Sequence, residues 1–240
     1  MTLFRTNPPS SSPTPNPHPP ITFCNIELPE SSSFKIVGLT ITGNLLWNKH
    51  ISNVYKSANK AISFLYKARR VMNKSSLTNI YTSHVRSRME YLSPIWSGSS
   101  GDSLSKLDRV QAKAMRLLGP AESSNLPLLS HRRAIAGLCA MHRIVHSSAP
   151  APALSLCPPR AQPRPASRTT RHSKPLFLVN PIVKRLTPKY WTHSFIPLMT
   201  VTWLTLQLQT ETNLKKFKKS ISELQLLDNM LYISHDLHMD

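Results

Sequence analysis

Four basic side chains recur at helical spacing in the segment 104–119. They are Lys106, Arg109, Lys113 and Arg116, which are separated by three, four and three residues. Residues at this spacing lie along one side of an α-helix, so the four charges form a single stripe. A stripe of fixed positive charge suits a nucleic-acid backbone, because it binds phosphates without reading base sequence and with a steep dependence on salt. We therefore predict that these four residues contact nucleic acid.

Two further basic residues, Arg132 and Arg133, stand at the predicted start of another helix. Positive charge at a helix N-terminus opposes the helix dipole, and a nearby phosphate or carboxylate relieves that cost. One interpretation adds both arginines to the nucleic-acid contacts. The other pairs them inside the protein with a carboxylate such as Glu90, Asp102 or Asp108.

The composition points to a polyanionic partner. The 240 residues include 30 Lys and Arg against 11 Asp and Glu, a formal net charge of +19. Nucleic acid is favoured over membrane, because no apolar run approaches the roughly 20 residues that a spanning helix needs. No apolar run of the kind found in secretory signals follows Arg5. The three cysteines are far apart, which predicts reduced thiols in an intracellular protein.

Patterns typical of catalysis and metal binding are missing from the sequence. A two-metal site needs carboxylates that hold two ions about 4 Å apart, and the sequence has no Asp-Asp or Asp-x-Asp pair. His142 and His146 have the spacing of a zinc-binding H-E-x-x-H helix, but Arg143 replaces the glutamate. There is no G-x-S-x-G nucleophile turn. We predict no catalytic residue, no metal ligand and no cofactor in this chain.

The hydrophobic pattern predicts a mainly α fold with one small β-hairpin. Two β-rich runs, 21–28 and 34–42, flank a short loop and should pair with each other. Apolar residues then recur at spacings of three and four, which predicts a bundle of about four helices over 47–71, 76–89, 104–118 and 130–146.

Several residues are candidate helix ends. Asp102 and Ser103 are predicted to cap the third helix at its N-terminus, and Gly119-Pro120 to end it. Ser75 or Ser76 is the predicted cap of the second helix.

The remaining segments contain more Pro, Ser and basic residues. We predict five regions: a disordered Pro/Ser-rich tail over 1–20, the hairpin over 21–43, the helical bundle over 44–148, a basic Pro/Arg-rich linker over 149–190, and a poorly ordered C-terminal segment over 191–240. Within the last region, 214–227 can form a weakly anchored helix that exposes Lys215, Lys216, Lys218 and Lys219.

Two bulky side chains have both a structural and a functional interpretation. His50, near the start of the first helix, is either a ligand or base, or a residue that caps and packs; the second is favoured. Trp96 either stacks on a base or packs in the core, and its position between two core-facing helices favours the core.

Five motif stretches resemble one protein family when they are taken together. Leu107-Asp108-Arg109-Val110-Gln111 resembles an L-[DE]-R-V-Q signature, and 34–40 resembles F-K-[YL]-L-G-[VL]-T with Ile36 and Val37 as departures. The stretch 90–96 resembles E-Y-x-S-x-[IV]-W, 129–133 matches L-S-H-R-R, and 194–218 resembles a degraded S-F-[IF]-P ending in which Leu198, Met199 and Leu204 depart from the pattern. The family is that of non-LTR retrotransposon reverse transcriptases, of the jockey-like, LINE-type kind.

The resemblance implies a C-terminal portion of an RNA-directed DNA polymerase, downstream of its catalytic palm. The helical bundle would be thumb-like, and the hairpin with Lys35 would touch the primer strand. The partners would be an RNA template with a DNA primer, and the missing palm and fingers of the parent polyprotein. The family uses Mg²⁺ at paired aspartates that this chain lacks, so the resemblance implies inactivity of the chain alone. A nuclear location follows if the life cycle of the parent element applies.

Two alternatives remain open. In the first, the chain is the inert, partly folded product of a decayed element, which the lost C-terminal pattern favours. An independent basic RNA-binding protein would also fit the net charge, but it leaves the motif run unexplained.

Overall fold

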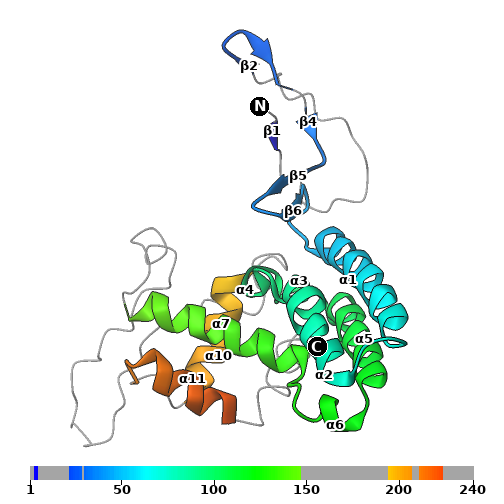
Figure 1. Cartoon of the computed structure of the whole chain (residues 1–240). Helices are drawn as coiled ribbons and strands as arrows, with labels where there is room; N and C mark the ends of the chain where they lie inside the picture. Colours follow the sequence, from blue (N-terminus) through cyan, green and yellow to red (C-terminus); the bar gives the residue numbers. More distant parts are fainter. Residues whose placement is uncertain (1–2, 5–21, 29, 147–193, 207–210, 224–240) are drawn as a thin grey trace, which may run out of the picture.

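The computed structural model describes residues 3–4, 22–28, 30–146, 194–206 and 211–223 (Figure 1). The described chain is mainly helical, with small two-stranded sheets near the N-terminus, which confirms the predicted fold class. Predictions for 149–190, and for most of 1–20, fall outside the described residues.

The strands of the described residues form three separate two-stranded sheets. β2 (Thr22–Phe23) is antiparallel to β3 (Ile26–Glu27), β5 (Ser33–Ile36) is antiparallel to β6 (Leu39–Thr42), and β1 (Leu3–Phe4) is parallel to β4 (Glu30–Ser31).

The predicted pairing of 21–28 with 34–42 is therefore wrong, because each run turns back on itself. The two turns are Cys24-Asn25, with φ of 50° and 61°, and Val37-Gly38, with φ of 47° and 80°. Positive φ at both central residues is the hallmark of a type I′ turn, whose twist matches that of two directly paired strands.

Four long helical regions follow, in agreement with the predicted bundle. They are α1 (Asn48–Ala68), the run of α2 (Lys74–Ile80), η1 (Tyr81–Arg86) and α3 (Ser87–Glu90), then α5 (Gly101–Leu118) and α7 (Leu129–Val145). Two short helices, α4 (Ser93–Trp96) and α6 (Pro120–Ser123), lie between them.

The second helical region differs from the prediction at its cap and at its centre. Asn73, not Ser75 or Ser76, caps it: the Asn73 side chain accepts a hydrogen bond from the Ser76 N–H at 2.8 Å. The centre, η1, is a π-helix, whose wider turn displaces the residues that follow from strict 3.6-residue spacing. His84 has the spacing of the apolar face, three residues after the buried Tyr81, but is exposed.

α5 also starts earlier than predicted. It begins at Gly101, so Asp102 and Ser103 lie in its first turn and do not cap it. Gly119 ends the helix as expected, because its φ of 90° is a backbone conformation that favours glycine.

The first hydrophobic core lies among α1, the α2–η1–α3 run and α5. Its largest fully buried side chains include Ile51, Leu77, Tyr81, Trp96, Leu107 and Leu129. The indole Nε1–H of Trp96 donates to the Tyr91 carbonyl at 3.0 Å. Trp96 is therefore a core residue and presents no free face for a base, as the favoured interpretation holds.

A second core forms where α7 meets α10 (Phe195–Thr205) and α11 (Leu214–Glu223) (Figure 1). Its fully buried members include Leu138, Met141, Met199, Trp203 and Phe217. Two stretches of the region expected to be poorly ordered, 194–206 and 211–223, are thus packed. The weak anchoring expected for the last helix is wrong for its described part, because Phe217 and Ile221 are fully buried.

Candidate nucleic-acid interface

α5 has the two faces that its sequence predicts. Leu107, Val110, Ala114 and Leu118 are buried against the first core. On the other side Arg109, Lys113 and Arg116 are exposed, and Lys106 is half-buried. The buried face fixes the rotation of the helix about its axis, and the stripe is therefore held toward solvent.

The four stripe residues keep their charge available. Lys113 Nζ donates to Asn59 Oδ1 at 3.4 Å, and Arg109 Nε donates to the Ser105 carbonyl at 3.4 Å. Both partners are neutral. None of the ion pairs found within the described residues involves Lys106, Arg109, Lys113 or Arg116. The stripe is thus a row of uncompensated cations.

α1 lies beside α5 and runs in the same direction (Figure 1). Near the starts of the two helices, Ser103 Oγ lies 3.0 Å from Asn48 Oδ1, and about two-thirds of the way along, Lys113 reaches Asn59. Parallel neighbours of this kind place equivalent turns side by side. The α5 stripe therefore lies next to α1 at Lys113, which contacts Asn59.

α1 contributes a second row of cations to this surface. Lys56 precedes Asn59 by one turn, and Lys60 and Lys67 follow on the same side as Lys56; all three are exposed. We call these three residues, together with the four of the α5 stripe, the α1–α5 cationic surface. The α1 lysines were not among the nucleic-acid contacts predicted from the sequence, although their spacing of four and seven already places them on one face.

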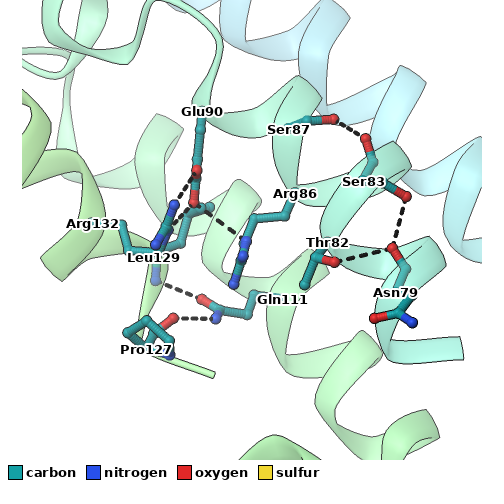
Figure 2. A network of polar contacts seen from close by, with 10 residues as sticks. All are labelled: Asn79, Thr82, Ser83, Arg86, Ser87, Glu90, Gln111, Pro127, Leu129 and Arg132. Carbon is teal, nitrogen blue, oxygen red and sulfur yellow. Dashed lines mark hydrogen bonds and ion pairs between the residues drawn. The ribbon is translucent and has the colours of Figure 1, made fainter. Parts of the chain in front are cut away.

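Arg132 and Arg133 are engaged inside the protein. Arg132 forms a two-pronged ion pair with Glu90, in which Nη2 donates to Oε2 at 2.8 Å and Nε donates to Oε1, and Arg86 Nε lies 3.7 Å from the same carboxylate (Figure 2). The hydrogen bond to Glu90 raises the pKa of Arg132.

Arg133 is paired with Asp108. Its Nη2 donates to the two carboxylate oxygens at 3.0 and 3.2 Å, and only 3% of its side chain is exposed. The structure thus has both arginines in the internal ion pairs that the sequence analysis offered as the alternative. These carboxylates offset the cost of positive charge at the start of α7, and we leave both arginines out of the interface.

Gln111 completes the junction between α5 and α7. Its side-chain Oε1 accepts the Leu129 N–H at 2.7 Å, and its Nε2 donates to the Pro127 carbonyl at 3.0 Å (Figure 2). A buried amide with both ends satisfied holds the entry to α7 in one position. The polar residues of three motif stretches therefore contact one another through the pairs Glu90–Arg132, Asp108–Arg133 and Gln111–Leu129.

Lys35 lies apart from the α5 stripe. It is exposed on β5, in the hairpin that packs on the first turns of α1. Contacts that hold that hairpin include Lys49 Nζ, which donates to Ser33 Oγ at 2.7 Å, and the Tyr91 hydroxyl, which donates to the Val37 carbonyl at 3.2 Å. The structure does not bring Lys35 together with Lys113 or Arg116, which lie toward the other end of the α1–α5 pair.

His50 joins the hairpin to the bundle. Its Nδ1 accepts the Thr40 N–H at 3.3 Å, and its ring packs near the rings of Trp47 and Trp96 with centroid distances of 6.2 and 6.1 Å. Burial lowers the pKa of His50, and the nearby charge of Lys35 lowers it further. The structure thus shows His50 in a packing role, as the favoured interpretation holds.

His142 and His146 pack in the second core. Their ring centroids are 4.5 Å apart, and the His142 ring lies 4.6 Å from that of Phe217. His142 Nε2 is 2.8 Å from the Glu211 carbonyl oxygen. Within the described ranges no group of three or more His, Cys, Asp or Glu side chains is arranged to hold a metal ion.

Among the helices that the structure describes, none is long and apolar enough to cross a membrane. Comparison of the chain with models of known protein families, with curated proteins and with solved structures gives no match.

Proposed function

We propose that the α1–α5 cationic surface binds the sugar-phosphate backbone of nucleic acid. We further propose that the chain is the thumb-like portion, downstream of the catalytic palm, of a reverse transcriptase from a non-LTR retrotransposon. On this proposal the surface holds an RNA template paired with a DNA primer. The motif stretches support the family, and the surface supports the binding.

One observation carries the proposal: seven cations lie on two adjacent helices, and the four on α5 have no carboxylate partner among the described residues. α5 has 18 residues and is about 27 Å long. A duplex presents one phosphate charge per roughly 1.7 Å of its axis, so a surface of this length faces several phosphates at once. Contacts of this kind hold a duplex without selecting its sequence.

Charge reversal on α5 tests the proposal. The variant carries Lys106→Glu, Arg109→Glu, Lys113→Glu and Arg116→Glu, and the probe is a blunt RNA–DNA hybrid measured by fluorescence anisotropy at moderate salt. We expect binding to be lost, because four attractive contacts become repulsive. The logarithm of the wild-type binding constant should fall steeply with the logarithm of salt concentration, and each neutralised phosphate should contribute a slope of about 0.9.

The chain offers a matched control on α11. Lys215, Lys216, Lys218 and Lys219 are also exposed, and their reversal to Glu changes the net charge by the same amount. This control should keep most of the wild-type affinity. Equal loss in both variants would assign binding to net charge alone, and unchanged binding in the α5 variant would refute the proposal.

A further inference from the structure

An exposed aromatic side chain lies among cations at the C-terminal end of α1. Tyr66 is 51% exposed, and the guanidinium carbon of Arg69 lies 4.0 Å from the centre of its ring. Lys67 and Arg70 are exposed beside it. The ring thus has a cation over one face, a contact worth about 0.5–1 kcal/mol at an exposed site.

Tyr66 continues the α1–α5 cationic surface. It follows Asn59 by seven residues, which is close to two helical turns and places both on the same side of α1. Asn59 contacts Lys113, so this side of α1 is the side that borders the α5 stripe. α5 ends at Leu118, five residues after Lys113, whereas Tyr66 follows Asn59 by seven, so the ring lies just past the end of α5. At this end Lys74 Nζ donates to the Leu117 carbonyl at 2.6 Å. The ring thus lies where the row of cations ends.

We propose that Tyr66 and Arg69 form a stacking platform for an unpaired base. This inference rests on the proposed function and narrows its ligand to nucleic acid with a single-stranded portion. Cations along the backbone together with an aromatic ring for a base are the combination by which proteins hold single strands. A paired base is stacked inside its duplex and cannot lie on the ring, so the platform favours a strand that leaves the duplex at this end of the surface.

Phe64 supplies an internal control. It is more exposed than Tyr66, at 61%, and lies on the same helix. Its position two residues earlier places it about 160° from Tyr66 around the helix, on the side away from Asn59. It is one turn from Lys60 and Lys67, so it is an exposed ring that also has cations beside it. Phe64→Ala therefore tests whether removal of any exposed ring from α1 weakens binding, whereas Tyr66→Ala removes the ring of the proposed platform.

The experiment compares two probes with four proteins of full length. The probes are a single-stranded RNA of about 12 nucleotides, within the site sizes of single-strand binders, and a blunt RNA–DNA hybrid of the same length. The proteins are the wild type and the variants Tyr66→Ala, Tyr66→Phe and Phe64→Ala. We expect Tyr66→Ala to weaken binding of the single strand roughly tenfold, because one base loses its stack.

Tyr66→Phe keeps the ring and should restore single-strand binding, while Phe64→Ala should match the wild type. All four proteins should bind the blunt hybrid alike. Equal binding of the single strand by Tyr66→Ala and the wild type, or an equal loss in Phe64→Ala, would overturn the platform. Such a result together with loss of binding in the α5 charge-reversal variant would leave the cationic surface in place and reject the platform alone.

Discussion

At the scale of single residues, the motif stretches contain two kinds of polar side chain. Glu90, Asp108 and Gln111 join helices to one another through contacts with α7. Arg109, in the same stretch as Asp108, points to solvent. Charged side chains that form ion pairs inside the protein, such as Glu90 and Asp108, hold the helices in one arrangement. An exposed charged side chain such as Arg109 is available to a ligand.

His50 should make folding stability depend on pH. Its pKa is lowered from the ordinary value of 6.5 in the folded protein, so the unfolded chain binds the proton more readily. Stability is therefore full above about pH 6.5 and falls as the pH drops toward the lowered pKa. Protonation also removes the acceptor that Nδ1 offers to Thr40.

Urea unfolding between about pH 7.5 and pH 5 measures this dependence. His50→Gln, which keeps an acceptor but does not titrate, should show a flatter profile than the wild type. His84→Gln changes an exposed histidine and serves as the control. Identical profiles for the wild type and His50→Gln would show that His50 does not couple folding to protonation.

At the scale of elements, local chemistry sets where helices and turns begin and end. Helix formation leaves the first N–H groups without intrahelical partners, and a side chain with an oxygen at the right position satisfies one of them. Asn73 does so in the structure, although Ser75 and Ser76 are equally plausible by residue type. The type I′ turns at Cys24-Asn25 and Val37-Gly38 likewise decide which strands pair.

Removal of the Asn73 cap should destabilise the protein. Asn73→Ala leaves the Ser76 N–H without its acceptor, and we expect a loss of about 1 kcal/mol in the free energy of unfolding. Ser75→Ala, at one of the two positions predicted from the sequence, should change stability little. Urea unfolding of both variants decides between the two caps, and a larger loss in Ser75→Ala would contradict the structure.

At the scale of the whole molecule, α7 belongs to both cores. Leu129 at its start packs in the first, and Leu138 and Met141 pack in the second. Met199, Thr200 and Trp203 of α10 are fully buried, so its neighbours cover the helix at these positions. The two cores therefore share one continuous helix, and unfolding of the second core removes support from the first.

Phe217→Ala tests this coupling. Phe217 is fully buried among His142, Trp203 and their neighbours, and its truncation should lower the free energy of unfolding by about 3–4 kcal/mol. Phe64→Ala, which removes an exposed ring, should have little effect. We expect one cooperative transition in the wild type.

Two outcomes would contradict this account. An unchanged midpoint in Phe217→Ala would mean that α11 does not pack on α7. Absence of a cooperative transition in the wild type would favour the inert, partly folded product that the sequence analysis left open.

Features that depend on neighbours within a few turns could be predicted from the sequence. Periodicity located the four long helical regions, the buried and charged faces of α5, and its end at Gly119. These features could be predicted because an apolar stripe at helical spacing has a single way to be buried. Within the second region, η1 departs from 3.6-residue spacing because its turn is wider, and His84 is therefore exposed at a position where regular spacing predicts the apolar face.

Contacts between residues that are far apart in the sequence could not be predicted in this way. Arg132 pairs with Glu90, which is 42 residues away in the sequence, and Arg133 pairs with Asp108, which is 25 residues away. Two residues that were predicted to contact nucleic acid therefore form internal ion pairs. The same packing set the lysines of α1 beside the stripe of α5 and buried Phe217 against α7. Such contacts depend on how the helices stack in space, and charge and spacing along one helix do not specify its neighbours.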